Sequence, residues 1–166
     1  MGSIYTSRGS LNVRDSFSAE FSITAVNAAI SANDVMGVAQ ELVYIGPHTG
    51  GEIIITSTQL WVYHTALISG ETSYNLHLYN VTPPSAHADN DAWDLPSGDR
   101  AAYLGYVALG TPVDLGSTLY VEVNGLNKQI TGLSNNTGSL WAELVTVGAF
   151  TPTAAVRRVR VHSIAV

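Results

Sequence analysis

Alternation of apolar and polar side chains in short segments most limits what this chain can fold into. Residues 74–79, 119–123 and 140–144 each place an apolar side chain at every second position. A period of two is typical of β-strands that bury one face and leave the other outside. No stretch has the period of a long helix, and the chain is therefore predicted to be all-β.

About eight strands are expected, separated by turn residues. They are 21–26, 35–45, 52–66, 74–79, 103–109, 119–123, 140–144 and 156–166. Thr56-Ser57-Thr58 interrupts the third and predicts a bulge or a bend, and Asn124-Gly125 predicts a hairpin turn. This spacing fits an antiparallel β-sandwich, jelly-roll-like or Greek-key, without fixing the strand order.

The length of 166 residues corresponds to one domain. Residues 21–166 are predicted to form the sandwich, and residues 1–20 a polar, Ser-rich N-terminal arm that contains Arg8 and Arg14. Two interpretations of the arm stay open. It is a frayed terminus, or it docks on a neighbouring molecule through the two arginines.

The charge is unevenly distributed along the chain. Residues 15–99 contain ten acids and no Lys or Arg, and the net charge is -6. An acidic body argues against nucleic-acid binding, which requires basic surface. Charged residues make up only 12% of the chain, about half the usual share, which predicts that partners cover part of the surface.

Other segments exclude further classes. No apolar stretch approaches the length of a membrane span, and no signal-peptide pattern begins the chain, so a soluble protein made in the cytosol is expected. There is no cysteine, which excludes disulfides and thiolate metal sites.

The acidic segment between the strands 74–79 and 103–109 holds the only candidate metal ligands. Asp89, Asp91 and Asp94 lie within six residues, and calcium prefers several oxygen ligands from one flexible loop. The Gly and the distal Glu of the EF-hand pattern are missing. A solvated loop capped by its own aspartates is therefore favoured over a calcium site, and no cofactor is predicted.

The histidines and serines give no catalytic pattern. No pair of histidines has a metal-ligand spacing such as H-E-x-x-H, and no Gly-x-Ser-x-Gly motif occurs. His64 and His77 lie in strong strand segments and are placed to meet across neighbouring strands. No catalytic residue is predicted, and the protein is not expected to be an enzyme.

Three side chains at outward positions are candidate interface residues. Trp141 alternates with inward residues on 140–144, and Arg158 and Arg160 do so on the last strand. An exposed tryptophan suits a subunit contact, which is favoured over a sugar-stacking platform built with Trp61 and Trp93. The arginines are expected to pair with acids of the same sheet or of a neighbouring subunit, with Glu122 and Glu143 as natural partners.

Several segments resemble short motifs of small β-rich virion proteins of tailed bacteriophages. They are Ser31-Ala32-Asn33-Asp34-Val35-Met36-Gly37, Leu76 to Pro84, Asp89-Asn90-Asp91-Ala92-Trp93, Leu140 to Val145 and Phe150-Thr151-Pro152. The resemblance implies a structural protein of the virion, most like a head decoration (cementing) protein. It also implies a place on the capsid surface, the major capsid protein as partner, self-association as a homo-oligomer such as a trimer, and synthesis in the host cytoplasm.

Two alternatives stay open beside this interpretation. One is a tail, fibre or baseplate component that contacts host glycans. The other is a carbohydrate-binding β-sandwich module, for which Trp141 is the best candidate contact.

Overall fold

The computed structural model describes residues 15–48, 50–133 and 137–166, which form nine β-strands. These are β1 (Ser16–Thr24), β2 (Val35–Leu42), β3 (Ile53–Val62), β4 (Tyr74–Tyr79), β5 (Tyr103–Ala108), β6 (Val113–Asp114), β7 (Leu119–Ile130), β8 (Leu140–Thr146) and β9 (Val156–Ala165). The predicted all-β class is confirmed. No helix in the described ranges is long and apolar enough to cross a membrane.

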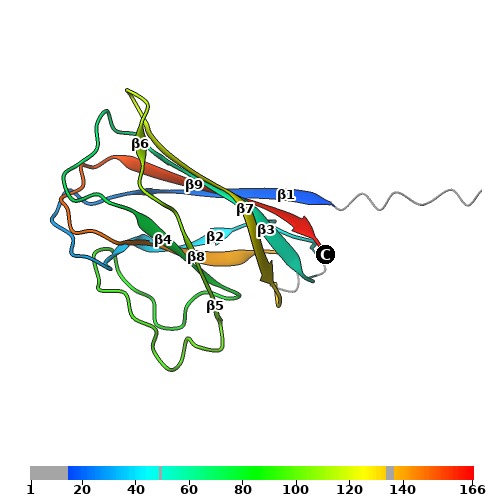
Figure 1. Ribbon diagram of the computed structural model, residues 1–166. Coiled ribbons are helices and arrows are strands. Elements are labelled where there is room, and N and C mark those ends of the chain that lie inside the picture. Colours follow the sequence, from blue (N-terminus) through cyan, green and yellow to red (C-terminus); the bar gives the residue numbers. More distant parts are fainter. Residues whose placement is uncertain (1–14, 49, 134–136) are drawn as a thin grey trace, which may run out of the picture.

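The strands form two antiparallel sheets that pack face to face (Figure 1). One sheet has the order β1-β9-β3-β7-β6 and the other β2-β8-β4-β5. The pairs β1·β9, β2·β8, β3·β7 and β4·β5 are nested, so that strands from the two ends of the chain pair successively inward. This is a long two-stranded ribbon folded into two sheets. It identifies the predicted sandwich as a jelly roll.

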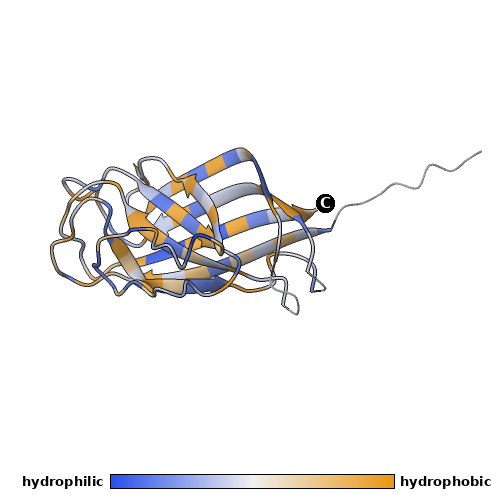
Figure 2. Ribbon diagram, turned by 90° about the horizontal axis from the view of Figure 1, so that it is seen from below, coloured by the Kyte–Doolittle hydropathy of each residue, from blue (hydrophilic) through white to orange (hydrophobic). Residues whose placement is uncertain are grey.

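The core lies between the sheets and follows the period of two. Figure 2 shows hydrophilic and hydrophobic residues alternating along the strands. Leu60, Leu76, Leu78, Val159 and Val161 are fully buried in this core. The inward positions predicted for β4, β8 and β9 are confirmed by this burial. Burial of apolar area is the dominant stabilising contribution in such a sandwich.

The predicted bulge in β3 is confirmed by its register with β9, which shifts from Ile55↔Ser163 to Ser57↔His162 and leaves one extra residue in β3. The predicted hairpin at Asn124-Gly125 is wrong. The pairing register between β3 and β7 shifts from Ile55↔Lys128 to Ser57↔Asn124. β7 therefore has extra residues at this point and continues to its end at residue 130. Gly125 has φ 70, a left-handed conformation that glycine adopts at low cost, and it serves a strand irregularity rather than a chain reversal.

The boundary predicted for the N-terminal arm also needs correction. β1 begins at Ser16, and its residues 16–20 pair with β9. Its serines alternate with apolar residues, so they occupy the outer face of an edge strand. The sandwich therefore includes residues 16–20. Arg8 and Arg14 lie outside the described residues.

One ion pair is completely buried inside the sandwich. Arg157 and Glu71 are both 0% exposed, with 3.3 Å between Arg157 Nη2 and Glu71 Oε1. Arg157 Nε donates to the hydroxyl of Tyr74 at 3.1 Å, and Tyr74 in turn donates to Glu71. Burial is the main cause that raises the pKa of Tyr74. The charge of Arg157 lowers this pKa, and the charge of Glu71 raises it. The trio connects β9 of one sheet to β4 and its preceding turn.

Removing one member of this pair is expected to be costly. Glu71→Ala leaves a buried guanidinium without its carboxylate and should lower the free energy of unfolding by about 3–5 kcal/mol, measured by urea denaturation. The matched control is Glu122→Ala, because Glu122 accepts only an exposed hydrogen bond from Gln59. Its loss should stay below about 1 kcal/mol. Equal small losses in the two variants would contradict this role of the buried pair.

Candidate functional site

The acidic loop of residues 80–102, between β4 and β5, covers the outer face of the four-stranded sheet. It pairs with the start of β2, where the amide of Val35 donates to the carbonyl of Asp91 at 2.8 Å and the amide of Asn90 donates to the carbonyl of Val35 at 2.9 Å. The amide of Gly37 donates to Asp89 Oδ1 at 2.7 Å. The loop is therefore fixed to the edge of the sheet along its acidic segment.

A buried aspartate closes the base of the same loop. Asp99 is 0% exposed, and its carboxylate accepts a hydrogen bond from the amide of Ser85, with 3.1 Å to Oδ1. Its carbonyl accepts from the amide of Ala102 at 2.9 Å, and the carbonyl of Ala102 accepts from the amide of Asn80 at 3.0 Å. The two ends of the loop are thus held side by side.

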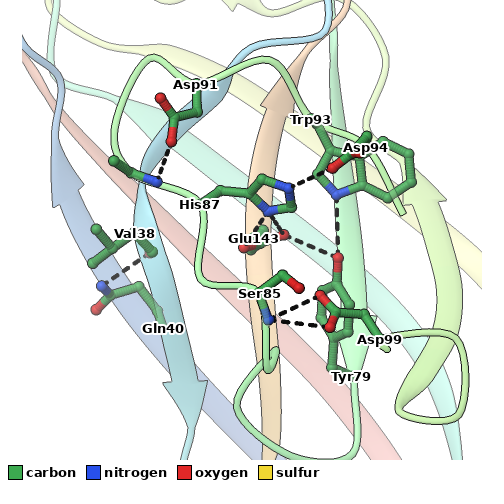
Figure 3. A network of polar contacts seen from close by, with 11 residues as sticks. Val38, Gln40, Tyr79, Ser85, His87, Asp91, Trp93, Asp94, Asp99 and Glu143 are labelled. Atoms are coloured by element: carbon green, nitrogen blue, oxygen red, sulfur yellow. Dashed lines mark hydrogen bonds and ion pairs between the residues drawn. The ribbon is translucent and has the colours of Figure 1, made fainter. Parts of the chain in front are cut away.

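Beneath the loop lies a hydrogen-bonded cluster centred on Glu143 (Figure 3). The Glu143 carboxylate is fully buried and accepts a hydrogen bond from the Tyr79 hydroxyl at 3.0 Å. His87 lies between two carboxylates, with its Nδ1 3.1 Å from Glu143 Oε1 and its Nε2 3.2 Å from Asp94 Oδ1. Glu143 occupies an outward position of β8, but not a solvent-exposed one. It does point away from the core, but the loop covers it.

The surroundings of His87 favour its charged form. Burial alone would lower the pKa of His87, but the hydrogen bonds to Asp94 and Glu143 and the charges of both carboxylates outweigh it and raise that pKa. A protonated His87 donates to both partners and neutralises the buried charge of Glu143. The contacts of His87 with Asp94 and Glu143 hold the loop on the sheet, which is a structural role.

His77 lies beside this cluster and is kept neutral. Its ring packs against Trp93 in a tilted arrangement, with 3.9 Å between ring centroids, and its Nδ1 lies 3.0 Å from the Tyr103 hydroxyl. Burial, followed by the charge of His87, lowers the pKa of His77 to about 4. His77 does not meet His64 across neighbouring strands, because His64 follows β3, which belongs to the other sheet.

The three candidate calcium ligands turn toward different partners. Asp89 accepts from Gly37, Asp91 Oδ2 accepts from the amide of Ala88 at 2.8 Å, and Asp94 contacts His87. Within the described ranges, no group of three or more His, Asp or Glu side chains is arranged to hold a metal ion. The aspartates act as turn and loop contacts.

A second candidate site lies on the outer face of the five-stranded sheet. Arg158 and Arg160 both bind Oε2 of Glu20, with shortest distances of 2.6 and 2.8 Å. Their guanidinium carbons lie 5.5 and 5.2 Å from the ring centroid of Trp61. The ring centroids of Trp61 and Tyr120 are 5.5 Å apart. These five residues, from β1, β9, β3 and β7, are called the arginine–tryptophan face below.

This face brings together two predicted interface residues, which pair as predicted with an acid of their own sheet. The acid is Glu20 and not Glu122 or Glu143, because β1 lies next to β9, whereas β3 separates β9 from β7 and β8 belongs to the other sheet. Hydrogen bonds from the two arginines lower the pKa of Glu20. Trp141 is half-buried on the opposite sheet, where β8 pairs with β4.

No protein-family model and no curated protein matches this chain. Among solved structures, a chain of the cyanophage Pam1 capsid asymmetric unit has a TM-score of 0.38 and 17% identity, covering 92% of this chain and 86% of that chain. Desmodium yellow mottle tymovirus gives 0.27 and 14%, covering 99% and 92%, and tobacco necrosis virus gives 0.29 and 13%, covering 90% and 95%. Likenesses at this level carry no argument about function.

The contacts of His87 predict a pH-dependent stability. The pKa of His87 is raised in the folded state. The positive charge of His87 therefore stabilises the fold fully at a pH below the ordinary histidine pKa, and this stabilisation is lost as pH rises through the raised pKa. The difference in unfolding free energy between the wild type and His87→Gln should therefore be larger at pH 6 than at pH 9, measured by urea denaturation. The control is His64→Gln, outside the cluster. A difference that grows toward pH 9 would refute the assigned sign.

Proposed function

We propose that this chain is a structural protein of a tailed-phage particle, a head decoration protein that binds the major capsid protein on the outer surface of the shell. The observation that carries the proposal is spatial. The separate segments that resemble phage virion proteins come together in one part of the molecule.

The contacts between these segments are direct. Residues 31–37 pair with residues 89–93 through the bridge between Asp34 and Ala92. The same segment continues into β2, where Val35 pairs with Val145 of the resembling stretch of β8, which in turn lies beside β4. A bridge between Ile30 and Phe150 adds the last segment. Short matches that are distant in sequence but contiguous in space support a shared architecture better than scattered matches do.

In this proposal the protein acts by binding through its surfaces and not by catalysing a reaction. A protein that binds only the assembled shell stabilises it by mass action. For contact between copies, the arginine–tryptophan face supplies side chains of the kind enriched at interfaces, half-exposed on a rigid sheet. Residues 1–14, with Arg8 and Arg14, supply a basic segment that leads into β1. Self-association as a trimer completes the proposal.

The location is tested first by labelling intact particles of the encoding phage with an antibody against this chain and imaging them by electron microscopy. Label over the whole head is expected. Label confined to the tail would contradict decoration and support a tail or fibre component, and unlabelled particles would overturn the virion role altogether.

A truncation tests the basic N-terminal segment. Deletion of residues 1–14 stops before β1 and should leave the unfolding free energy within about 1 kcal/mol of the full chain, since no described strand is lost. Binding to heads that lack the protein should weaken at least tenfold, measured by co-sedimentation. The charge control is Arg8→Gln with Arg14→Gln in the full chain. Unchanged binding of the truncated chain would refute the docking role.

A glycan-binding role has one observation in its favour. Trp61 is flanked by arginines and Trp93 packs against His77, whereas Trp141 is half-exposed without an aromatic partner among the described contacts. If this alternative holds, glycans should produce a saturable change in tryptophan fluorescence that Trp141→Ala abolishes and Trp61→Ala does not. A glycan array without binding would remove it.

A further inference from the structure

The acidic and basic surfaces of this chain lie on opposite sides of the sandwich. The strands β1, β9, β3 and β7, which carry the arginine–tryptophan face, belong to one sheet, and the loop of residues 80–102 lies beyond the other sheet (Figure 1). Both sheets and the core separate them. The two surfaces therefore have no means of contact within one molecule, but they are accessible to neighbouring copies.

Within the arginine–tryptophan face, two guanidinium groups face one carboxylate, and the next acid across the sheet, Glu122, accepts a hydrogen bond from Gln59. Arg158 and Arg160 each direct Nε and Nη2 to the same oxygen, Oε2 of Glu20. Two guanidinium groups thus share one carboxylate, and each retains further N–H donors. The side chains are about one-third exposed, at 32% and 33%. A second carboxylate placed here would relieve the repulsion between the two cations and accept the remaining donors.

The acidic loop presents carboxylates in a fixed geometry. Asp91 is exposed and is oriented by its own contact to the amide of Ala88. Asp94 remains 74% exposed although it contacts His87. Because the loop is fixed to β2 and to Glu143, little conformational entropy would be lost when these carboxylates bind.

We propose that the arginine–tryptophan face is a docking surface for the acidic loop of a second copy of this chain. Asp91 and Asp94 of one copy contact Arg158 and Arg160 of the next, with Trp61 beneath them. The argument rests on charge complementarity between two pre-ordered surfaces, and it does not depend on the proposed virion role.

This contact joins two different surfaces, so its geometry is heterologous. Repeated from copy to copy, such a contact closes into a ring when the rotation between copies permits, and otherwise continues as an open stack. Each copy then contributes one face and one loop. A variant that has lost only one of these surfaces still has the other available for a partner.

The experiment uses the full chain and measures self-association by analytical ultracentrifugation, at low salt and at 0.5 M NaCl. The wild type should associate, with affinity falling at high salt because the pairs are partly exposed. Arg160→Glu and Asp91→Lys should each weaken association at least tenfold. An equimolar mixture of the two variants should associate again, because the intact loop of the first docks on the intact face of the second.

Matched controls separate this contact from effects of net charge and folding. Arg100→Glu and Asp114→Lys make the same charge changes at exposed positions outside the contact and should associate like the wild type. Asp91→Asn keeps an acceptor for the Ala88 amide, and Arg160→Gln avoids a new carboxylate beside Glu20. Both should weaken association while leaving the circular dichroism spectrum unchanged.

Three results would each overturn the proposal. They are a wild type that stays monomeric at every concentration, association that the face and loop variants leave unchanged, and a mixture of Arg160→Glu with Asp91→Lys that fails to associate. Labelling of phage particles is read separately, so failure of the virion role and failure of this contact are distinguishable.

Discussion

The buried carboxylate of Glu143 determines how the loop of residues 80–102 packs on the four-stranded sheet. An ionised group in that position persists only when hydrogen bonds and an opposite charge replace its hydration. Tyr79 and His87 meet this requirement from two different segments. The loop that carries His87 must therefore lie on the sheet, and it buries Val35 and Val145 outside the main core as it does so. Polar contacts thus assemble a second packed layer.

The separation of charge has a physical consequence for this chain. Exposed charges are screened over about 8–10 Å at physiological salt, so surfaces on opposite sides of the sandwich act almost independently. Each presents its own charge to whatever approaches it.

The sequence predicted what depends on local pattern and missed what depends on tertiary pairing. Leu76 and Leu78 were placed inward correctly, because the side-chain period of a strand is local. Glu143 occupies an outward position of the same kind, and only the covering loop makes it buried. The apolar Val145 two positions later was the available signal that this outer face is not solvated. Glu20 was missed as the partner of two arginines, because the pairing of β1 with β9 follows from topology. Asn124-Gly125 was assigned to a hairpin, although its backbone also suits a bulge.

The nested pairing of strands also affects when the fold can form. Glu20 and Arg160 are hydrogen-bonded across 140 positions of the chain. The strand that carries Arg160, β9, lies inside the five-stranded sheet, between β1 and β3. During synthesis, β1 and β3 lack their common neighbour until β9 has emerged. Such long-range closure is slow and leaves strand edges unpaired. The unpaired edges therefore place this chain at risk of aggregation during synthesis rather than after it has folded.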